Sequence, residues 1–343
     1  MSEGVDTAVV ECGIGGEYDS TNILVQPTVT GITSLGIDHV AMLGGTIEEI
    51  AWHKAGIMKH GALAFTAPQP EAALTVLRRR AEEKGVELHV VDQHPQLDTI
   101  KLGLAADFQK TNASLAIAIA AAHLRALRHN DIPPDITTAP LPAEFRRGLE
   151  QVQWGGRCET RKERNIAWHI DGGHTLESID VAGKWFASQI QPSSSTYTPP
   201  SKRKRVLIFN QQTRDAGALA RALHKTLADA LGDEKPFTRA IFCSNVTFKE
   251  AGFKPDLVSV NTNAVDVEEL SVQKGLARMW AEIDGQTVVE VVRAIEEAVA
   301  IVRGLAGKEM GGEDVMVLVT GSVHLVGGFL EVLESGKGSV GSA

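Results

Sequence analysis

Cysteine is scarce in this 343-residue chain, which holds only Cys12, Cys158 and Cys243. The three lie far apart in the sequence and fit neither a disulfide framework nor the spacing of a zinc site. No apolar run reaches the ~20 residues that a membrane-spanning helix needs. We therefore expect a protein of a reducing compartment, without integral membrane association.

Long runs of Lys or Arg are also missing, and the formal net charge is -9. This balance argues against a nucleic-acid or membrane-surface protein, so a site for an anionic ligand has to be built locally. The first residues show neither a basic region with an apolar core nor an Arg-rich targeting helix. With 43% hydrophobic residues, the chain is long enough for two globular domains with cores.

Short β-branched runs alternate with helix-like segments, which predicts two α/β domains, each with a largely parallel sheet covered by helices. The first domain, residues 1–150, ends near a Pro-containing stretch. Its expected strands are residues 7–10, 28–33, 62–66 and 86–91, and its expected Ala-rich helix is 112–127. The alternation restarts in the second domain, 151–343, with IAWHID, RVLIFN, RAIFCSN and DVMVLVT. Residues 191–204, rich in Pro, Ser and Lys, predict a surface insertion.

Two polar residues follow the first expected strands. Glu11 comes before a turn with Gly13, Gly15 and Gly16, and His39 follows the strand at 28–33. Ligands bind at the carboxyl edge of open α/β sheets, and a carboxylate with an imidazole suits a divalent ion such as Mg²⁺. Taken singly, Glu11 also fits a solvated carboxylate and His39 a turn residue.

Lys54 lies in a predicted helix with an apolar stripe. Thr46 and Glu49 have the spacing of a capping box, so the helix is expected to begin there. A lysine buried in such a stripe has a lowered pKa and a nucleophilic amine that can form a carbamate with carbon dioxide. The alternative is a lysine whose ammonium reaches the solvent.

Several long segments resemble the Mur ligase superfamily, and specifically the folylpolyglutamate synthases, in the order found in that family. They are VECGIGGEYDSTNI, SLGIDHVAMLGGTIEEIAWHKAGIMK, QKTNASLAIA, WGGRCE, HIDGGHTLES, LIFNQQTRDAGAL and TGSVHLVGG. The resemblance implies a Mur-ligase-like central domain, incomplete here, and a Rossmann-like C-terminal domain.

The resemblance also implies roles for single residues. Glu11 and His39 correspond to magnesium ligands, and Lys54 to a carbamylated lysine. On the nucleotide side, Asn112 resembles a position near the adenine, Arg157 an ATP-phosphate ligand and Asp171 a nucleotide-contacting residue. His174 and Ser322 resemble residues of catalysis or glutamate handling. From the residues alone, Asp171 and Ser322 also fit helix caps, and Arg157 fits an interdomain ion pair.

The implied reaction adds L-glutamate to the γ-carboxylate of tetrahydrofolate and its polyglutamates, with ATP and Mg²⁺, through an acyl phosphate. A phosphate-binding loop, GxxxxGK[ST], has no match in the chain. In the family that loop precedes the region where this sequence begins. We therefore expect an N-terminally truncated family member, by gene model, fragment or natural short form, whose own activity is weak or absent. NQQTRDAGAL departs from the usual acidic, proline-containing version and is left outside the expected site.

Other functions stay open at this point. Dihydrofolate synthase shares most of the motifs and uses pteroate. A non-catalytic fragment would bind nucleotide, metal or a partner, and a zinc hydrolase would use Glu11, His39 and further histidines. We expect a monomer in the cytoplasm, with the mitochondrion as a second location.

Overall fold

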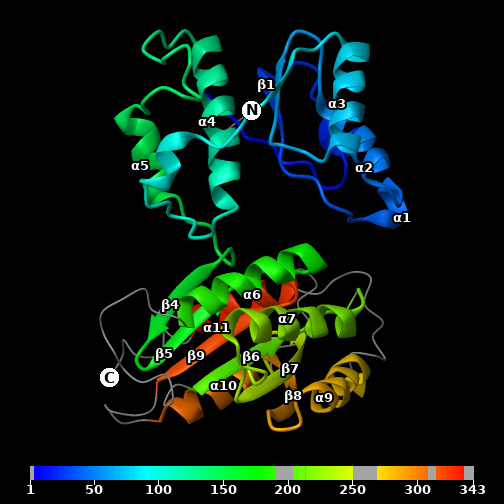
Figure 1. Cartoon of the computed structure of the whole chain (residues 1–343), viewed down its shortest axis with the longest axis vertical. Helices are drawn as coiled ribbons and strands as arrows, with labels where there is room; N and C mark the ends of the chain where they lie inside the picture. Colours follow the sequence, from blue (N-terminus) through cyan, green and yellow to red (C-terminus); the bar gives the residue numbers. More distant parts are fainter. Residues whose placement is uncertain (1–3, 191–203, 213, 250–268, 308–313, 336–343) are drawn as a thin grey trace. The chain divides into compact units, whose positions relative to one another are not determined.

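The computed structural model describes residues 4–190, 204–212, 214–249, 269–307 and 314–335. The chain divides into two compact units, Met1–Gln153 and Trp154–Ala343 (Figure 1). Apart from Lys204, the expected surface insertion at 191–204 lies outside the described residues. None of the helices in the described ranges combines the length and the apolar character needed to span a bilayer.

The first unit contains a parallel three-stranded sheet in the order β1-β2-β3. Its strands are β1 (Val29–Ile32), β2 (Leu63–Thr66) and β3 (Leu88–Val90), which confirms three of the four expected strands. The helices of this unit are η1 (Ser20–Ile23), α1 (Val40–Leu43), α2 (Ile47–Lys54), η2 (Ala55–Ile57), α3 (Glu71–Lys84), η3 (Pro95–Asp98), α4 (Gln109–Ala126) and α5 (Ala143–Gln151).

Helices cover both faces of this sheet because successive side chains of a strand point to opposite sides. Ala64 of β2 packs into a core with α2 and α3, whereas the next residue, Phe65, packs with Leu115 and Ala118 of α4. At Gly31 the strand has no room for a side chain, since a Cβ would overlap the side chain of Ile119. The Ala-rich helix therefore seats directly on β1.

The strand expected at residues 7–10 does not form. The segment is extended but has no strand assignment, and Val9 is 97% exposed. Its β-branched residues Thr7, Val9 and Val10 supply β propensity, but a strand is stabilised by ladder hydrogen bonds and cross-strand contacts. The described residues provide no pairing partner. The prediction was therefore wrong for this segment, and Glu11 does not end a strand.

The second unit is built on a six-stranded sheet in the order β4-β5-β9-β6-β7-β8, antiparallel only at β4. The strands are β4 (Glu159–Glu163), β5 (Ile166–Ile170), β6 (Lys204–Phe209), β7 (Arg239–Val246), β8 (Val288–Ala294) and β9 (Val315–Thr320). The four expected strands are confirmed, and β4 and β8 are additional. Because β9 inserts between β5 and β6, the carboxyl ends of these three strands are neighbours.

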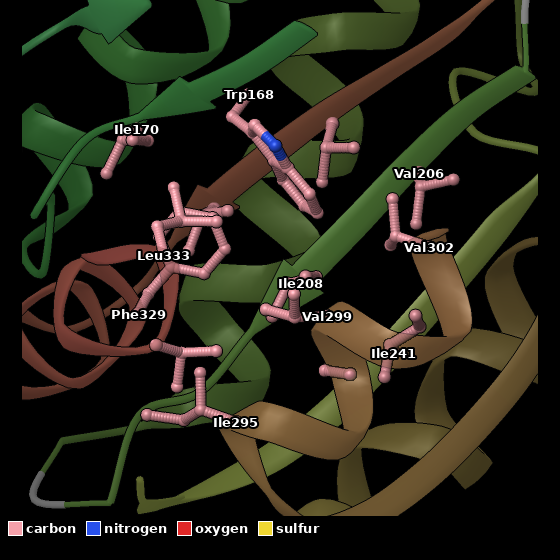
Figure 2. Packing of buried hydrophobic residues seen from close by; sticks show 14 of the residues in the cluster. Trp168, Ile170, Val206, Ile208, Ile241, Ile295, Val299, Val302, Phe329 and Leu333 are labelled. Atoms are coloured by element: carbon pink, nitrogen blue, oxygen red, sulfur yellow. The ribbon is translucent and has the colours of Figure 1, made fainter. Parts of the chain in front are cut away.

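Helices again cover both faces of the sheet. The ring of Trp168 on β5 meets that of Phe329 on α11 (Val323–Ser335) with centroids 5.1 Å apart, in a core shared with α10 (Ile295–Ala306) (Figure 2). On the other face, His169 packs against Trp185 and Phe186 of α6 (Leu176–Ile190). This face is also covered by α7 (Ala216–Leu231) and α9 (Ser271–Ile283). The two α/β units confirm the expected fold class.

Candidate functional site

The glycine turn that follows Glu11 packs against the end of α2. The amide of Glu17 donates to the carbonyl oxygen of His53 at 2.8 Å. A Cβ on Gly16 would lie 2.9 Å from that oxygen and 3.0 Å from the carbonyl oxygen of Lys54, so glycine permits the close approach. The turn and the helix end that carries Lys54 are thus brought together.

Lys54 is the last residue of α2, and the capping box that begins this helix is confirmed. The hydroxyl of Thr46 accepts from the Glu49 amide at 3.2 Å, and the Glu49 carboxylate accepts from the Thr46 amide at 3.1 Å. Ile50 and Ala51 of the apolar stripe are fully buried, whereas Lys54 is half-buried. Its position at the edge of the core is compatible with either reading of this lysine, so carbamylation stays a prediction.

Glu11 and His39 are both exposed, on separate loops of the first unit. His39 precedes α1 with a left-handed backbone, φ 52°, which polar residues adopt more readily than β-branched ones. Its amide donates to Asp38 Oδ1 at 2.7 Å, and its Nε2 lies 3.7 Å from Asp38 Oδ2. Asp38 therefore orients the loop from which His39 projects.

The metal expected at Glu11 and His39 can be tested against their donor chemistry. Mg²⁺ is held by one or two protein groups and completes its shell with waters and phosphate oxygens, so the two side chains fit in number and the carboxylate of Glu11 fits in type. Over the described ranges, no group of three or more His, Cys, Asp or Glu side chains is placed to hold an ion. The two ligands, Glu11 and His39, therefore stay a prediction.

Asn112 lies in the first turn of α4 and is half-buried. Its Nδ2 donates to Gln109 Oε1 at 3.0 Å, so the two carboxamides of the QxxNA pattern form a pair at the start of the helix. A carboxamide has both donors and an acceptor, which suits the edge of a purine base. Its role near the adenine stays a prediction.

In the second unit, Asp171 follows β5 and joins two turns. Its Oδ2 accepts from the Cys158 amide at 2.9 Å and from the Cys158 thiol at 3.4 Å, and its Oδ1 accepts from the Gly173 amide at 2.9 Å. Beside it, the Gly172 amide donates to the carbonyl oxygen of Gly156 at 2.9 Å. Asp171 therefore clamps the WGGRC turn to the turn that leads into α6.

Charge at this clamp is balanced by several groups. Asp171 is 5% exposed, and burial raises its pKa, while the hydrogen bonds from Cys158 and Gly173 and the charge of Arg157 act in the opposite direction. Burial and the charge of Asp171 also raise the pKa of the Cys158 thiol, which keeps it protonated as a donor. Arg157 itself is half-buried. The predicted phosphate ligand and the predicted nucleotide contact are thus electrostatic neighbours.

His174 lies at the start of α6, two residues beyond Gly172. Its Nδ1 is 2.9 Å from the Gly172 carbonyl oxygen, and its amide donates to Ser178 Oγ at 2.9 Å. Ser178 Oγ also accepts from the Thr175 amide at 2.9 Å, and Thr175 Oγ1 accepts from the Ser178 amide at 3.2 Å. Thr175 and Ser178 therefore cap this helix, and the reading of Asp171 as its cap is wrong.

Ser322 lies in the glycine turn after β9, as expected, and is 6% exposed. Its Oγ accepts from the His324 amide at 3.2 Å, so this serine does cap the first turn of α11. The preceding Gly321 has φ 109° and no room for a Cβ, which would lie 2.7 Å from the carbonyl oxygen of Asn210. The capping hydrogen bond fixes the position of the Ser322 hydroxyl. Its role in catalysis or glutamate handling stays a prediction.

Buried carboxamides after β6, near the end of β7 and on α9 were not among the expected site residues. Asn210 Nδ2 donates to Asn245 Oδ1, and Gln273 Nε2 donates to Asn210 Oδ1, both at 2.7 Å. Next to them, Gln211 Nε2 donates to the Gly321 carbonyl oxygen at 2.9 Å. A polar pair directly after the buried run RVLIF is the sequence signal that would have drawn attention to this edge.

Comparison with known proteins identifies the relatives of this chain. It is 45% identical over 335 residues to the folylpolyglutamate synthase of Neurospora crassa, an alignment that covers 97% of the chain and 62% of the relative. The resemblance to the folylpolyglutamate synthase family is confirmed. The folylpolyglutamate synthase of Saccharomyces cerevisiae is 43% identical over 339 residues, 97% of the chain and 58% of the relative. The chain thus spans about three fifths of the curated folylpolyglutamate synthases it matches.

Solved folylpolyglutamate synthase structures share the fold. The Mycobacterium tuberculosis enzyme, complexed with ADP and AMPPCP, superposes with a TM-score of 0.66 at 21% identity over 96% of this chain and 69% of that one. The apo form from L. casei gives a TM-score of 0.61 at 20% identity, over 96% and 67%. No family model matches the chain. The shared fold of the solved structures agrees with the expected α/β fold class.

Proposed function

We propose that this chain carries most of the active site of a folylpolyglutamate synthase, an ATP-dependent ligase that adds L-glutamate to the γ-carboxylate of tetrahydrofolate and its polyglutamates. The observation that carries the proposal is the 45% identity to the Neurospora crassa enzyme over 97% of the chain. Supporting it, Asp171, His174 and Ser322 follow β5 and β9, which are neighbouring strands of one sheet.

The proposed reaction has two steps. The terminal carboxylate of the folate attacks the γ-phosphorus of ATP. The bond from the γ-phosphorus to the bridging oxygen breaks, ADP departs, and the folate carries an acyl phosphate. The amino group of glutamate then attacks the acyl carbon, phosphate leaves with the bonding electrons, and the amine loses a proton. The products are an amide, ADP and inorganic phosphate, and both steps gain from holding the reactants in line.

Residues of this chain would bind and orient the reactants. Arg157 would hold ATP phosphate by charge-assisted hydrogen bonds, and the clamp at Asp171 would fix the turn from which Arg157 projects. His174 and Ser322 would orient glutamate or accept its proton. Asn112 would contact the adenine. Glu11 and His39 would hold Mg²⁺, which when bound neutralises phosphate charge, and a carbamate on Lys54 would add a carboxylate beside the glycine turn.

The proposal includes weak or absent turnover by the chain alone. GxxxxGK[ST], which supplies backbone amides and a lysine to nucleotide phosphates, has no match in the sequence. We further propose a monomer of the cytoplasm, with the mitochondrion as a second location. Neither nucleic acid nor a membrane is a proposed partner.

A chimera tests the function. The 335-residue stretch of the Neurospora crassa enzyme that aligns with this chain is replaced by this chain, and ADP release is measured with tetrahydrofolate, glutamate and Mg²⁺ beside the chain alone. The proposal predicts glutamate-dependent ADP release by the chimera. Dependence on pteroate in place of tetrahydrofolate would identify a dihydrofolate synthase. A folded chimera without either activity would favour a binding role.

A further inference from the structure

Gln211 lies directly after β6, in the segment NQQTRDAGAL that the expected site leaves out. This residue is only 3% exposed, and its Nε2 donates to the carbonyl oxygen of Gly321 at 2.9 Å. A buried carbonyl left without a donor costs free energy, so this hydrogen bond fixes the turn after β9 to the turn after β6.

Gly321 is also joined to the turn after β5. Its amide donates to the carbonyl oxygen of Gly173 at 3.1 Å. The residue next to Gly173 is His174 and the residue next to Gly321 is Ser322, so this hydrogen bond joins the two turns that carry the predicted catalytic side chains. With φ 109° and the carbonyl oxygen of Asn210 only 2.7 Å from where a Cβ would lie, position 321 accepts glycine and no residue with a side chain.

The backbone that carries Gln211 is itself held. The side chain of the preceding residue, Asn210, donates to Asn245 Oδ1 and accepts from Gln273 Nε2, both at 2.7 Å, and Asn210 and Gln273 are fully buried. The backbone of Gln211 is therefore held in place at the end of β6, so its hydrogen bond fixes the position of Gly321.

We propose that Gln211 is a positioning residue, which sets the place of Ser322 relative to His174 through Gly321. This rests on the proposed function, in which both of those side chains handle glutamate. In this proposal Gln211 acts on the reactants through the turn at Gly321 and not by contact with them. Its contribution is to keep the turns after β5, β6 and β9 in one arrangement when glutamate arrives.

Gln211→Met tests the proposal in the full chain, since it keeps the length of the side chain and removes the donor. Gln211→Glu is the second variant, which also removes the donor. Gln212→Glu is its matched control, because Gln212 accepts from Asn245 through its Oε1 and a glutamate at this position still has an acceptor oxygen. The measurements are amide hydrogen exchange at Gly321 and the imidazole NMR signals of His174, with those of His224 as reference. ADP release with tetrahydrofolate and glutamate, measured in the active chimera carrying the same substitutions, gives kcat and KM.

We expect exchange at Gly321 to rise about tenfold in Gln211→Met, as for one lost hydrogen bond. The His174 signals shift, the His224 signals do not, and kcat falls while KM for ATP is unchanged. Gln211→Glu behaves likewise and Gln212→Glu resembles the parent. Unchanged exchange and unchanged His174 signals in both Gln211 variants would overturn the positioning role. Shifted His174 signals in the Gln211 variants, together with a folded chimera that releases no ADP, would support the positioning role and count against the proposed function alone.

Discussion

Cys158 holds Asp171 through two atoms, its amide nitrogen at 2.9 Å and its sulfur at 3.4 Å from the same carboxylate oxygen. The backbone of Cys158 is left-handed, with φ 46°. This conformation is uncommon for a residue with a side chain and persists where the surroundings hold it. The pair joins the turn that carries Arg157 to the end of β5, so two predicted nucleotide contacts move as one unit.

The clamp predicts the effect of Asp171→Asn. The asparagine side chain has one acceptor oxygen, so its NH2 group would face the buried amide of either Cys158 or Gly173, and two donors would meet. We therefore expect the free energy of unfolding to fall by roughly 1–2 kcal/mol at pH 5. Because burial raises the pKa of Asp171, the native protein loses part of its stability as pH rises through that folded pKa. The loss caused by the variant is therefore smaller at higher pH.

Urea unfolding at several pH values measures this effect. Asp229→Asn is the matched control, since Asp229 is exposed on α7. Equal stability of Asp171→Asn and the parent at every pH would contradict the clamp.

His169 predicts a dependence of stability on acid. Burial lowers the pKa of His169 to about 4, so the folded protein keeps this imidazole neutral while the unfolded chain protonates it. Stability is therefore fully present above the unfolded pKa of about 6.5 and is lost as pH falls toward 4. From pH 7 to pH 5 the parent should therefore lose about 2 kcal/mol more of its free energy of unfolding than His169→Phe does. Urea titrations at the two pH values measure it, with exposed His129→Gln as control; parallel losses in all three proteins would contradict the prediction.

Close packing at the glycine turn predicts the effect of Gly56→Ala. A Cβ on Gly56 would overlap the backbone of Glu17, so the turn has to move away from α2 at a cost of about 2 kcal/mol or more. Gly36→Ala is the control, because no atom lies within 4 Å of its Cβ position. Amide exchange in α2 is the measurement. Equal exchange in the two variants would show that the turn does not depend on this contact.

Arg157 predicts a change in nucleotide binding. In the active chimera, Arg157→Ala should raise KM for ATP by about 10–100-fold, the range for a lost charge-assisted hydrogen bond. Arg221→Ala, at an exposed position of α7, should leave it unchanged. Steady-state ADP release at varied ATP measures both, and an unchanged KM in Arg157→Ala would remove this residue from the phosphate site.

The strands that sequence reasoning found are those with buried faces, such as Ile166–Ile170 and Val315–Thr320. It missed β4, whose residues ETRKE alternate in exposure at the sheet edge and show no apolar run. It also placed a strand at residues 7–10, because propensity is local and pairing is not. The position of Asp171 after a strand was predictable from pattern, whereas its three hydrogen bonds were not.

Gln211 shows the same limit at the site. Its partner, Gly321, is more than a hundred residues away in sequence, and the two meet because β9 inserts between β5 and β6. A polar residue after an apolar run marks a sheet edge. Which turn it contacts depends on strand order, which local patterns do not encode.

The most direct test follows oxygen from the folate to phosphate. The active chimera is given tetrahydrofolate whose terminal γ-carboxylate carries a heavy-oxygen label, together with ATP, glutamate and Mg²⁺, and the phosphate is analysed by mass spectrometry. Passage through an acyl phosphate predicts one labelled oxygen in each phosphate released with the glutamylated product. Unlabelled phosphate formed together with that product would contradict the account.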